Sequence, residues 1–458
     1  MIHKYKMFDM NIVLDIYSGA VHVVDDCLYD MLDYLLEPFS PERECPKFIF
    51  DELVKKYPED EVKDSYLDIC ELYNKGQLFT DDCYLEFAQN WNKQSVVKAL
   101  CLHIAHDCNL RCKYCFAGTG EYHGERGIMS AETGKKAIDF VIANSGNRKN
   151  IELDYFGGEP LMNFEVVKAI TEYAKEQGKK HGKNFRFTIT TNGVLLDDEK
   201  KAYINENMSN VVLSIDGRKE GNDRMRTRVD GTGTYDNIIP KFIDMAESRN
   251  QDNYYVRGTF TAFNKDFAED VIHLADLGFK QTSVEPVVAP YEEDYALTEN
   301  DIPEVFREYD KLAEEYLKRW KEGNSFNFFH FMVDLDQGPC AIKRLSGCGA
   351  GHEYLAVAAN GDLYPCHQFV GNHDFLMGNV FDGNINTGIR DYFEKSNIYT
   401  KDKCKNCFAK FYCSGGCSAN AQNFNGDINK PYDLACEFEK KRVECAIAIE
   451  AAKKLRRM

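Results

Sequence analysis

The segment LCLHIAHDCNLRCKYCFAG, residues 100–118, joins a short apolar run to a loop that holds three cysteines. The run LCLHIA predicts a buried β-strand. The loop that follows spaces Cys108, Cys112 and Cys115 as C-x3-C-x2-C. A structural zinc ion needs four ligands, a disulfide needs two cysteines, and a self-contained iron–sulfur cluster needs four. Three thiolates on a four-iron cubane would leave one iron open to a ligand from outside the protein.

The alternative for this loop is a zinc site of three cysteines and one histidine. His103, His106 and His123 are near enough in sequence to supply the histidine. The spacing, the aromatic Tyr114 before the last cysteine and the strand-to-helix loop that carries the pattern favour the iron–sulfur cluster.

Residues from about 97 to 290 alternate between strand-like and helical runs. The strand-like runs are LCLHIA, IELDYF, FRFTIT, NVVLSID, YYVRGTF and QTSVEPVV, with helical patterns such as AETGKKAIDFVIANS and FEVVKAITEYAKEQG between them. Six β-α repeats predict an α/β fold with a parallel sheet and right-handed crossovers. Six strands are too few for an eight-stranded barrel, so we expect a partial (β/α)6 barrel or an open sheet.

Polar and glycine-rich loops follow the first four of these strands. They are the Cys108–Cys115 loop, GGEP at residues 157–160, TTNG at residues 190–193 and SIDG at residues 214–217. Because the carboxyl ends of parallel strands meet at one edge of a sheet, these loops should lie together. We therefore expect one binding site that is assembled from several loops.

Two other regions flank this unit. Residues 1–90 contain two β-rich runs around Tyr17-Ser18-Gly19 and then three helical patterns, CLYDMLDYLLE, KFIFDELVKKY and VKDSYLDICELYNKG. This order predicts a small winged-helix-like module, and the alternative is a packing extension. Residues 301–330 predict a bridging amphipathic helix, and residues 331–458 form a cysteine-rich region that ends in a helix. We therefore assign the barrel to residues 91–300.

The 458-residue chain has a net charge of −18 and 17 cysteines. The charge disfavours DNA or RNA as a partner and favours a polypeptide or a small molecule. Because the sequence has no apolar run of transmembrane length and no secretory signal, we expect a cytoplasmic protein, in which metal binding explains clustered cysteines better than disulfides do. Scattered cysteines, for which we expect ordinary roles, are Cys27, Cys45, Cys70, Cys83, Cys101 and Cys445. The other eleven fall within residues 108–115 and 340–436.

The cysteine triplet and the loops after it resemble the signature of radical S-adenosylmethionine (SAM) enzymes. In that family SAM chelates the open iron of a 4Fe–4S cluster, here on Cys108, Cys112 and Cys115, and is cleaved to a 5′-deoxyadenosyl radical. The resemblance implies that GGEP meets the methionine amino group, that SID binds the ribose hydroxyls, and that an arginine in NDRMRTRVDGTGTYD pairs with the methionine carboxylate. The implied SAM contacts are Gly157, Gly158, Glu159, Thr191, Asn192, Ser214, Asp216 and Arg226.

The second group of cysteines resembles the seven-cysteine SPASM region of radical SAM enzymes that modify peptides and proteins. Its pattern is Cys348-x12-Gly361-x4-Cys366, then Cys404-x2-Cys407-x5-Cys413-x3-Cys417, then Cys436. The resemblance implies two auxiliary 4Fe–4S clusters, an outer one on Cys404, Cys407, Cys413 and Cys436 and an inner one on Cys348, Cys366 and Cys417. Cys340 is either the fourth ligand of the inner cluster or free, in which case a substrate thiolate could bind there. A zinc ribbon is the alternative, but it accounts for only four of these cysteines.

Over its whole length the chain resembles the maturases that install thioether crosslinks in SCIFF peptides, which are ribosomally made and cysteine-rich. The matching stretches are HDCNLRCKYCFAGTGEYHGERGIMS, LSGCGAGHEYLAVAANGDLYPCHQFVG and CKNCFAKFYCSGGCSANA. The resemblance implies that the N-terminal module binds the leader of the precursor peptide at a hairpin edge around residues 10–26. It also implies that a cysteine sulfur bonds to the carbon from which the radical takes hydrogen. An electron donor of the ferredoxin or flavodoxin type and an anaerobic cytosol would accompany this chemistry.

Two other functions remain open on the sequence. An anaerobic sulfatase-maturating enzyme, which oxidises Cys or Ser of a protein to formylglycine, shares the radical core and the C-terminal cysteine pattern. The N-terminal module argues against it, because that module implies leader binding. A non-catalytic electron carrier would hold several clusters but would have no use for the SAM-binding loops. The sequence gives no ground for assigning a general base.

Overall fold

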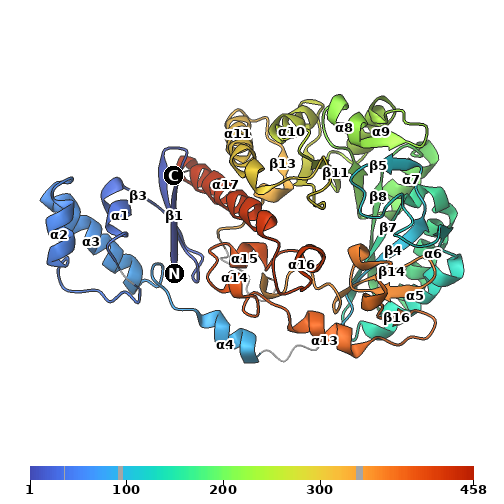
Figure 1. Ribbon diagram of the computed structural model, residues 1–458, viewed down its shortest axis with the longest axis horizontal. Helices are drawn as coiled ribbons and strands as arrows, with labels where there is room; N and C mark the ends of the chain where they lie inside the picture. The colour runs from blue at the N-terminus through green and yellow to red at the C-terminus, as the bar shows by residue number, and fades with distance from the viewer. Residues whose placement is uncertain (36, 91–95, 337–343, 458) are drawn as a thin grey trace.

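The computed structural model describes residues 1–35, 37–90, 96–336 and 344–457. An N-terminal module lies at one end, a curved sheet covered by helices lies at the other, and the cysteine-rich region lies between them (Figure 1). The C-terminal helix α17 (Asp433–Arg457) runs along this middle region toward the module. No helix within the described ranges combines the length and the apolar character that crossing a bilayer requires.

The N-terminal module is a three-stranded antiparallel sheet followed by helices. Strands β1 (Ile2–Met7), β2 (Met10–Asp15) and β3 (Val21–Val24) pair in the order β1-β2-β3. The side chains of β2 alternate between two cores: Val13 packs with the helices of the module, whereas Ile12 and Leu14 pack with the C-terminal region. The sheet is therefore covered on both faces. The helices are α1 (Asp26–Met31), α2 (Lys47–Leu53), α3 (Glu59–Asn74) and α4 (Cys83–Asn90).

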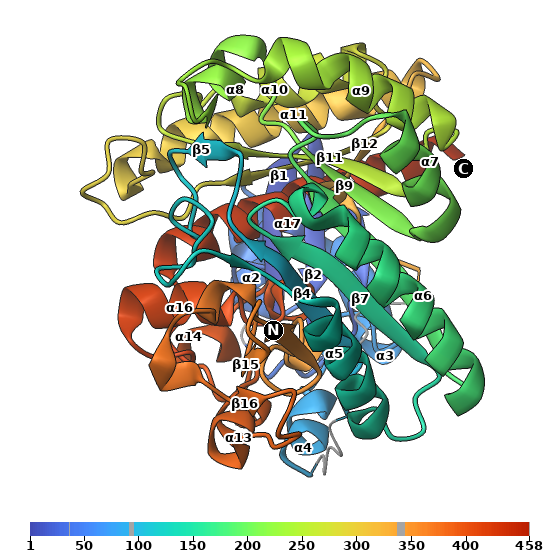
Figure 2. The same cartoon turned by 90° about the vertical axis from the view of Figure 1, so that its right-hand side faces the viewer.

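The six strands expected for the barrel form consecutive parallel strands of one sheet, which confirms the predicted α/β class. They are β4 (Ala99–His106), β7 (Asn150–Gly157), β8 (Asn184–Thr191), β9 (Asn210–Ser214), β11 (Tyr254–Phe260) and β12 (Gln281–Pro286), in the order β12-β11-β9-β8-β7-β4. Their outward apolar side chains share one core with the helices that follow them. These helices are α5 (Ala131–Asn144), α6 (Phe164–His181), α7 (Asp198–Asn207), α8 (Lys219–Met225), α9 (Tyr235–Ser248) and α10 (Phe267–Asp276). Figure 2 shows them along the outer side of the curved sheet.

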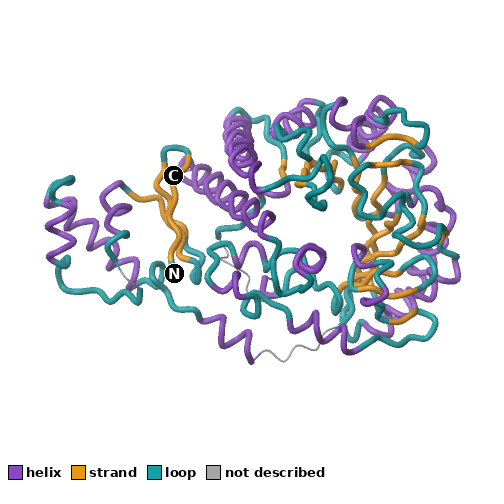
Figure 3. Tube along the Cα trace, viewed as in Figure 1, coloured by secondary structure: helices purple, strands orange, loops and turns teal. Residues whose placement is uncertain are grey.

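The sheet continues past these strands at both edges (Figure 3). Strand β13 (Asn327–Phe328) pairs with β12, and β14 (Tyr354–Val357) pairs in parallel with β4 at the other edge. Strands β15 (Asp362–Tyr364) and β16 (Gly378–Asn379) then add antiparallel. Since β14 to β16 follow residue 331, backbone pairing joins the cysteine-rich region to the barrel sheet.

Helix α11 (Ile302–Lys321) packs along α17, and α17 also contacts β1 and β3. Helix α17 therefore links the N-terminal sheet to the helices that surround the barrel. The remaining strands and helices are short: β5 (Leu110–Cys112), β6 (Gly127–Ile128), β10 (Arg226–Arg228), α13 (Thr387–Lys395), α14 (Asp402–Lys405), α15 (Lys410–Cys413) and α16 (Ser418–Asn425). The 3-10 turns are η1 (Pro160–Asn163), η2 (Glu299–Asp301), η3 (Phe329–Phe331), η4 (His367–Phe369) and η5 (His373–Phe375).

Candidate active site

The carboxyl ends of the barrel strands enclose a cavity of about 370 Å³. The cysteines Cys108, Cys112 and Cys115 line it together with every expected SAM contact except Asp216. The loops that the sequence places after four different strands therefore do meet at one site.

Backbone pairing fixes the cysteine loop against the segment that carries Arg226. Strand β5 pairs antiparallel with β10, and Cys112 lies opposite Arg226. The amide of Lys113 donates to the carbonyl of Met225 at 2.9 Å, and the amide of Leu110 lies 3.4 Å from the sulfur of Cys108. The backbone pairing thus holds the cysteine loop and the segment of Arg226 side by side.

The glycine pair at the start of GGEP lies directly under this loop. The Gly158 amide donates to the Ala105 carbonyl at 2.7 Å, and the Glu159 amide donates to the Asp107 carbonyl at 3.0 Å. A methyl group on Gly158 would lie 2.0 Å from the Asp107 oxygen, so only glycine permits this approach.

Glu159 is a buried carboxylate whose oxygens are held from three directions, and it is 1% exposed. It accepts hydrogen bonds from the Leu161 amide at 2.9 Å, the Thr191 hydroxyl at 2.8 Å and the Asn192 amide at 2.8 Å. The pKa of Glu159 is raised above its usual value, because burial raises it more than these donors and Arg226 lower it. Glu159 is therefore a carboxyl group that is fixed in the wall of the cavity.

Arg226, Tyr114 and Asp216 form a hydrogen-bonded chain, in which Arg226 and Tyr114 line the cavity and Asp216 lies behind them. Arg226 Nη1 donates to the Tyr114 hydroxyl at 2.8 Å, and that hydroxyl donates to the Asp216 carboxylate at 2.8 Å. The Thr259 amide donates to the same carboxylate at 3.1 Å. Burial raises the pKa of Asp216 to about 6, against the opposing effect of Arg226. Among the described residues, Arg226 Nε is buried without a hydrogen-bond partner.

The setting of Asp216 differs from the one that the family resemblance implies. Its side chain is 1% exposed and is not in the cavity wall, whereas Ser214, two positions earlier, is. Asp216 therefore positions Arg226 through Tyr114 instead of facing the cavity. The sequence singled out Tyr114 only as an aromatic residue inside the cysteine triplet, so its part in this chain was missed.

The donor set of the cavity fits SAM and an iron–sulfur cluster. Glu159 suits an ammonium group, the partnerless Arg226 Nε suits a carboxylate, and Ser214 suits a hydroxyl. Within the described ranges, no three His, Cys, Asp or Glu side chains converge closely enough for a single metal ion. The histidines proposed for zinc do not line the cavity that the three cysteines line: His103 Nδ1 is 3.2 Å from His106 Nε2, and His123 is exposed. This arrangement disfavours the zinc alternative.

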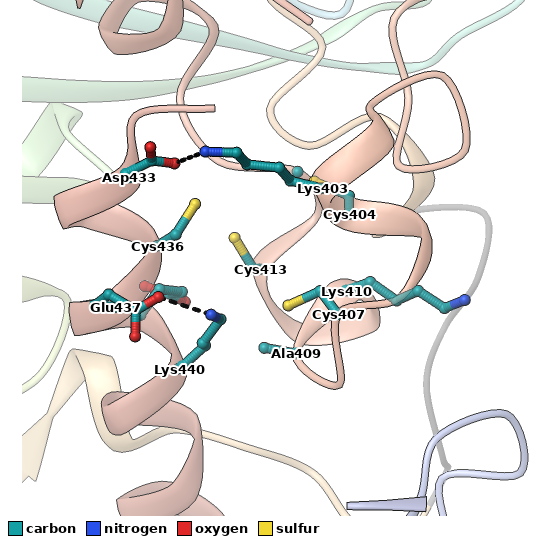
Figure 4. Close-up of a pocket in the computed structure, with 12 residues that line it drawn as sticks. Lys403, Cys404, Cys407, Ala409, Lys410, Cys413, Asp433, Cys436, Glu437 and Lys440 are labelled. Carbon is teal, nitrogen blue, oxygen red and sulfur yellow. Dashed lines mark hydrogen bonds and ion pairs between the residues drawn. The ribbon is translucent and has the colours of Figure 1, made fainter. Parts of the chain in front are cut away.

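The cysteines expected to hold the outer cluster, Cys404, Cys407, Cys413 and Cys436, line a second cavity of about 380 Å³. Figure 4 shows the sulfur atoms of Cys407, Cys413 and Cys436 turned toward a common space, with Cys436 contributed by α17. Ion pairs between Lys403 and Asp433 and between Lys440 and Glu437 lie beside it. Burial and the other thiols raise the pKa of Cys436 to about 12, so binding a cluster must displace its proton.

The cysteines expected to hold the inner cluster, Cys348, Cys366 and Cys417, lie near one another. Burial, followed by the thiols of Cys417 and Cys348, raises the pKa of Cys366, so these three sulfur atoms are electrostatic neighbours. Cys417 also lines the first cavity. Cys340 lies outside the described residues.

Several cavity residues have no counterpart in the sequence-based prediction. They are Arg257, Thr259, Glu285, His367, Gln368 and Asn420. Arg257 Nη2 donates to Glu285 Oε1 at 2.8 Å. Burial raises the pKa of Glu285, but Arg257 and His330 lower it by more, so that the pKa is about 2. Glu285 lies near the end of β12, so the rule used for the first four strands could have found it, whereas Arg257 lies in the middle of β11, where that rule does not apply.

Comparison with known proteins agrees with the class that this site defines. Residues 102–278 of the chain match the family model of the Radical SAM superfamily. A cysteine-type anaerobic sulfatase-maturating enzyme of Clostridium novyi is 24% identical over 72% of this chain and 90% of its own length. The radical SAM cyclopropyl synthase TigE of Paramaledivibacter caminithermalis is 22% identical over 75% of this chain and 72% of its own.

Solved structures show the same fold. Native anSMEcpe with bound AdoMet has a TM-score of 0.62 and 21% identity, and the match covers 76% of this chain and 96% of that one. Streptococcus suis SuiB bound to S-adenosylmethionine has a TM-score of 0.51 and 16% identity, covering 95% of this chain and 98% of that one. SuiB has also been solved bound to the precursor peptide SuiA, with a TM-score of 0.50 and 15% identity over the same shares of the two chains.

Proposed function

We propose that this protein is a radical SAM enzyme that joins cysteine sulfur to carbon within a ribosomally made, cysteine-rich precursor peptide. The observation that carries the proposal is the position of Cys417. This inner cysteine lines the same cavity as Glu159, Ser214 and Arg226. A substrate sulfur held near Cys417 would therefore lie in the compartment where SAM is cleaved, beside the carbon that loses hydrogen.

The side chains of the first cavity have distinct parts in this proposal. Arg226 binds the methionine carboxylate of SAM through Nε and its neighbouring amino nitrogen. Glu159 accepts from the methionine ammonium, and Ser214 accepts from the ribose. Tyr114 and Asp216 hold the guanidinium in place. Gly157, Gly158, Thr191 and Asn192 shape this pocket around the cofactor.

Three 4Fe–4S clusters are expected: one on Cys108, Cys112 and Cys115, and two on the inner and outer cysteines. When bound, SAM and these clusters supply one-electron chemistry, in which a hydrogen atom leaves the peptide carbon and the surplus electron is removed. The peptide also loses the thiol proton, so each crosslink removes two hydrogens and leaves one thioether. The inner group has three described thiols, and its fourth position falls to Cys340 or to the substrate thiolate.

The N-terminal module is proposed to bind the leader of the precursor peptide. Strand β3 is at an edge of the three-stranded sheet, and Val23 on it is 38% exposed. A peptide strand could pair with the backbone of this edge. SuiB, which resembles this chain over almost its whole length, has been solved with its precursor peptide. An electron donor of the ferredoxin or flavodoxin type would complete the system.

The variant Cys417→Ala tests the role of the inner cysteines. Reduced, cluster-loaded enzyme is incubated with SAM and the precursor peptide, and deoxyadenosine and peptide mass are measured together. We expect the variant to form deoxyadenosine without crosslinked peptide, whereas Cys83→Ala, which changes an exposed and scattered cysteine, behaves like the wild type. Crosslinking by Cys417→Ala at the wild-type rate would contradict the proposal.

The second candidate is formylglycine formation on a protein cysteine or serine. The similarity to the Clostridium novyi enzyme and to anSMEcpe favours it. The two reactions differ in their thiols: a thioether consumes a free thiol and keeps its sulfur, cysteine oxidation to formylglycine loses the sulfur, and serine oxidation changes no thiol. Counting alkylatable cysteines in the product separates serine oxidation from the other two reactions. The mass of the product, which shows whether the sulfur is retained, then separates the thioether from cysteine oxidation.

A further inference from the structure

Lys401 is a buried lysine in the middle of the cysteine-rich region, and it is 3% exposed. Its carbonyl accepts from the Cys404 amide at 2.9 Å, so it begins the turn that carries an outer cysteine. Its ammonium donates to the carbonyl of Gly415 at 2.8 Å. Gly415 lies in the three-residue segment between Cys413 and Cys417.

The ammonium therefore contacts the segment that joins the outer cysteine Cys413 to the inner cysteine Cys417. Burial lowers the pKa of Lys401, and thiols of both groups act in the opposite direction. Those thiols belong to Cys404, Cys413, Cys417 and Cys348. One cation is therefore within electrostatic range of both cysteine groups.

Lys401 has no anionic partner among the residues that the structure describes: no carboxylate there forms an ion pair with it. Another buried lysine of this region, Lys410, is different. It pairs with Asp82 at 3.3 Å and lies 4.5 Å from the centre of the Tyr17 ring. Figure 4 shows Lys410 extending away from the cysteine cavity. A buried ammonium without a counter-charge is costly, so an anion is expected near Lys401.

We propose that Lys401 is the counter-cation of the two auxiliary clusters and raises the reduction potential of both. This inference rests on the cluster assignment of the proposed function. A 4Fe–4S group on cysteine thiolates is anionic, and each added electron increases its negative charge. A nearby fixed cation stabilises the reduced form more than the oxidised form. Lys401 would thus make the auxiliary sites better electron acceptors without touching substrate.

The test is an EPR-monitored redox titration of the full chain after reconstitution with iron and sulfide, without peptide. It compares the wild type with Lys401→Gln, Lys401→Arg and Lys430→Gln. Lys430 is an exposed lysine of the same region, so its variant gives the same change of net charge. We expect Lys401→Gln to lower the reduction equilibrium constant of the auxiliary clusters at least tenfold, which is about 59 mV for one electron. Lys401→Arg, Lys430→Gln and the SAM-binding cluster of every variant should keep wild-type potentials.

Iron and sulfide contents are measured first, so that each outcome has one meaning. Fully loaded Lys401→Gln with unchanged auxiliary potentials would overturn the inference and leave the proposed function intact. Failure of both Lys401→Gln and Lys401→Arg to hold the auxiliary clusters would also overturn it, because shape and not charge would then matter. Failure of Lys401→Gln alone, with Lys401→Arg loaded, would support a counter-cation. A wild type that holds only one cluster would overturn the cluster assignment itself.

Discussion

Arg226 is the residue on which the orientation of SAM should depend most. Its Nη1 is already bound to Tyr114, so its buried Nε is left for a ligand. We predict that Arg226→Lys weakens SAM binding roughly 10- to 100-fold, because a hydrogen bond to a charged group contributes about 1.5–3 kcal/mol. Equilibrium dialysis of the cluster-loaded protein measures this. Arg224→Lys, an exposed neighbour on α8, is the matched control, and equal affinities of the two variants would contradict the assignment.

Gly158 should be intolerant of any side chain. The variant Gly158→Ala places a methyl group 2.0 Å from the Asp107 oxygen, and the backbone of the cysteine loop must move to relieve the contact. Overpacking of this kind costs about 1–3 kcal/mol. We therefore expect a lower iron content at the SAM-binding cluster and a lower unfolding midpoint. Gly127→Ala, where a methyl group meets nothing within 4 Å, should match the wild type in both.

The candidate site was predictable to the extent that single loops carry it. The cysteine triplet, GGEP, TTNG and Ser214 are contiguous motifs, and the structure brings them to one cavity. The orientation of Asp216 was not predictable, because it depends on Tyr114, which is far away in sequence. Asn420 and His367 face the same cavity from the cysteine-rich region, and no local pattern reveals that this region packs there.

At the scale of elements, long periodic segments were predictable and short edge strands were not. The six barrel strands agree with the sequence pattern because each is buried and followed by an amphipathic helix. Strand β1 was missed, since IHKYKM is mostly half-exposed and reads as a polar terminus. Strand β14 was missed because it is four residues long and its partner, β4, lies more than 200 residues earlier.

Strand β7 carries a titratable group on the inner side of the barrel. Burial and Glu152 raise the pKa of Asp154 from 3.8 to about 6. Between these values the folded protein binds the proton more tightly than the unfolded chain, so stability falls as pH rises through this window and then levels off. We predict that Asp154→Asn increases the free energy of unfolding at pH 7 by about 1–3 kcal/mol. The gain should disappear below about pH 4.

Thermal unfolding midpoints at several pH values measure this effect. Asp198→Asn provides the control, because the Asp198 side chain is 98% exposed. A midpoint for Asp154→Asn that is unchanged at pH 7, or that rises equally at all pH values, would show that the Asp154 charge is not the cause.

Strand β3 is the element on which leader binding should depend. We predict that Val23→Asp weakens binding of the leader peptide at least tenfold, because a buried charge next to an incoming strand is costly. Val23 is 38% exposed, so the free protein should fold normally. Fluorescence polarisation with a labelled leader peptide measures the affinity. Val229→Asp, at a site 65% exposed and outside the module, should bind the leader like the wild type; wild-type affinity of Val23→Asp would locate the leader elsewhere.

At the scale of the whole molecule, the N-terminal module, the outer cysteines, the inner cysteines and the first cavity are connected in that order. The N-terminal sheet packs on α17 and on the loops around the outer cysteines. Helix α17 contributes Cys436 to the outer group, the segment from Cys413 to Cys417 connects the outer group to the inner one, and Cys417 reaches the SAM cavity. The regions that we propose for peptide recognition, electron removal and hydrogen abstraction are therefore connected by direct packing and by the chain itself.

The central claim is the kind of bond that the enzyme makes, and the mass of the alkylated product tests it most directly. The reduced, cluster-loaded protein is incubated with SAM and a cysteine-rich precursor peptide, and the product is treated with iodoacetamide before mass spectrometry. Our account predicts a peptide that has lost two hydrogens and one alkylatable thiol for each crosslink, with all its sulfur retained. A product that has lost sulfur, or one that has lost two hydrogens while every cysteine is still alkylated, would contradict it.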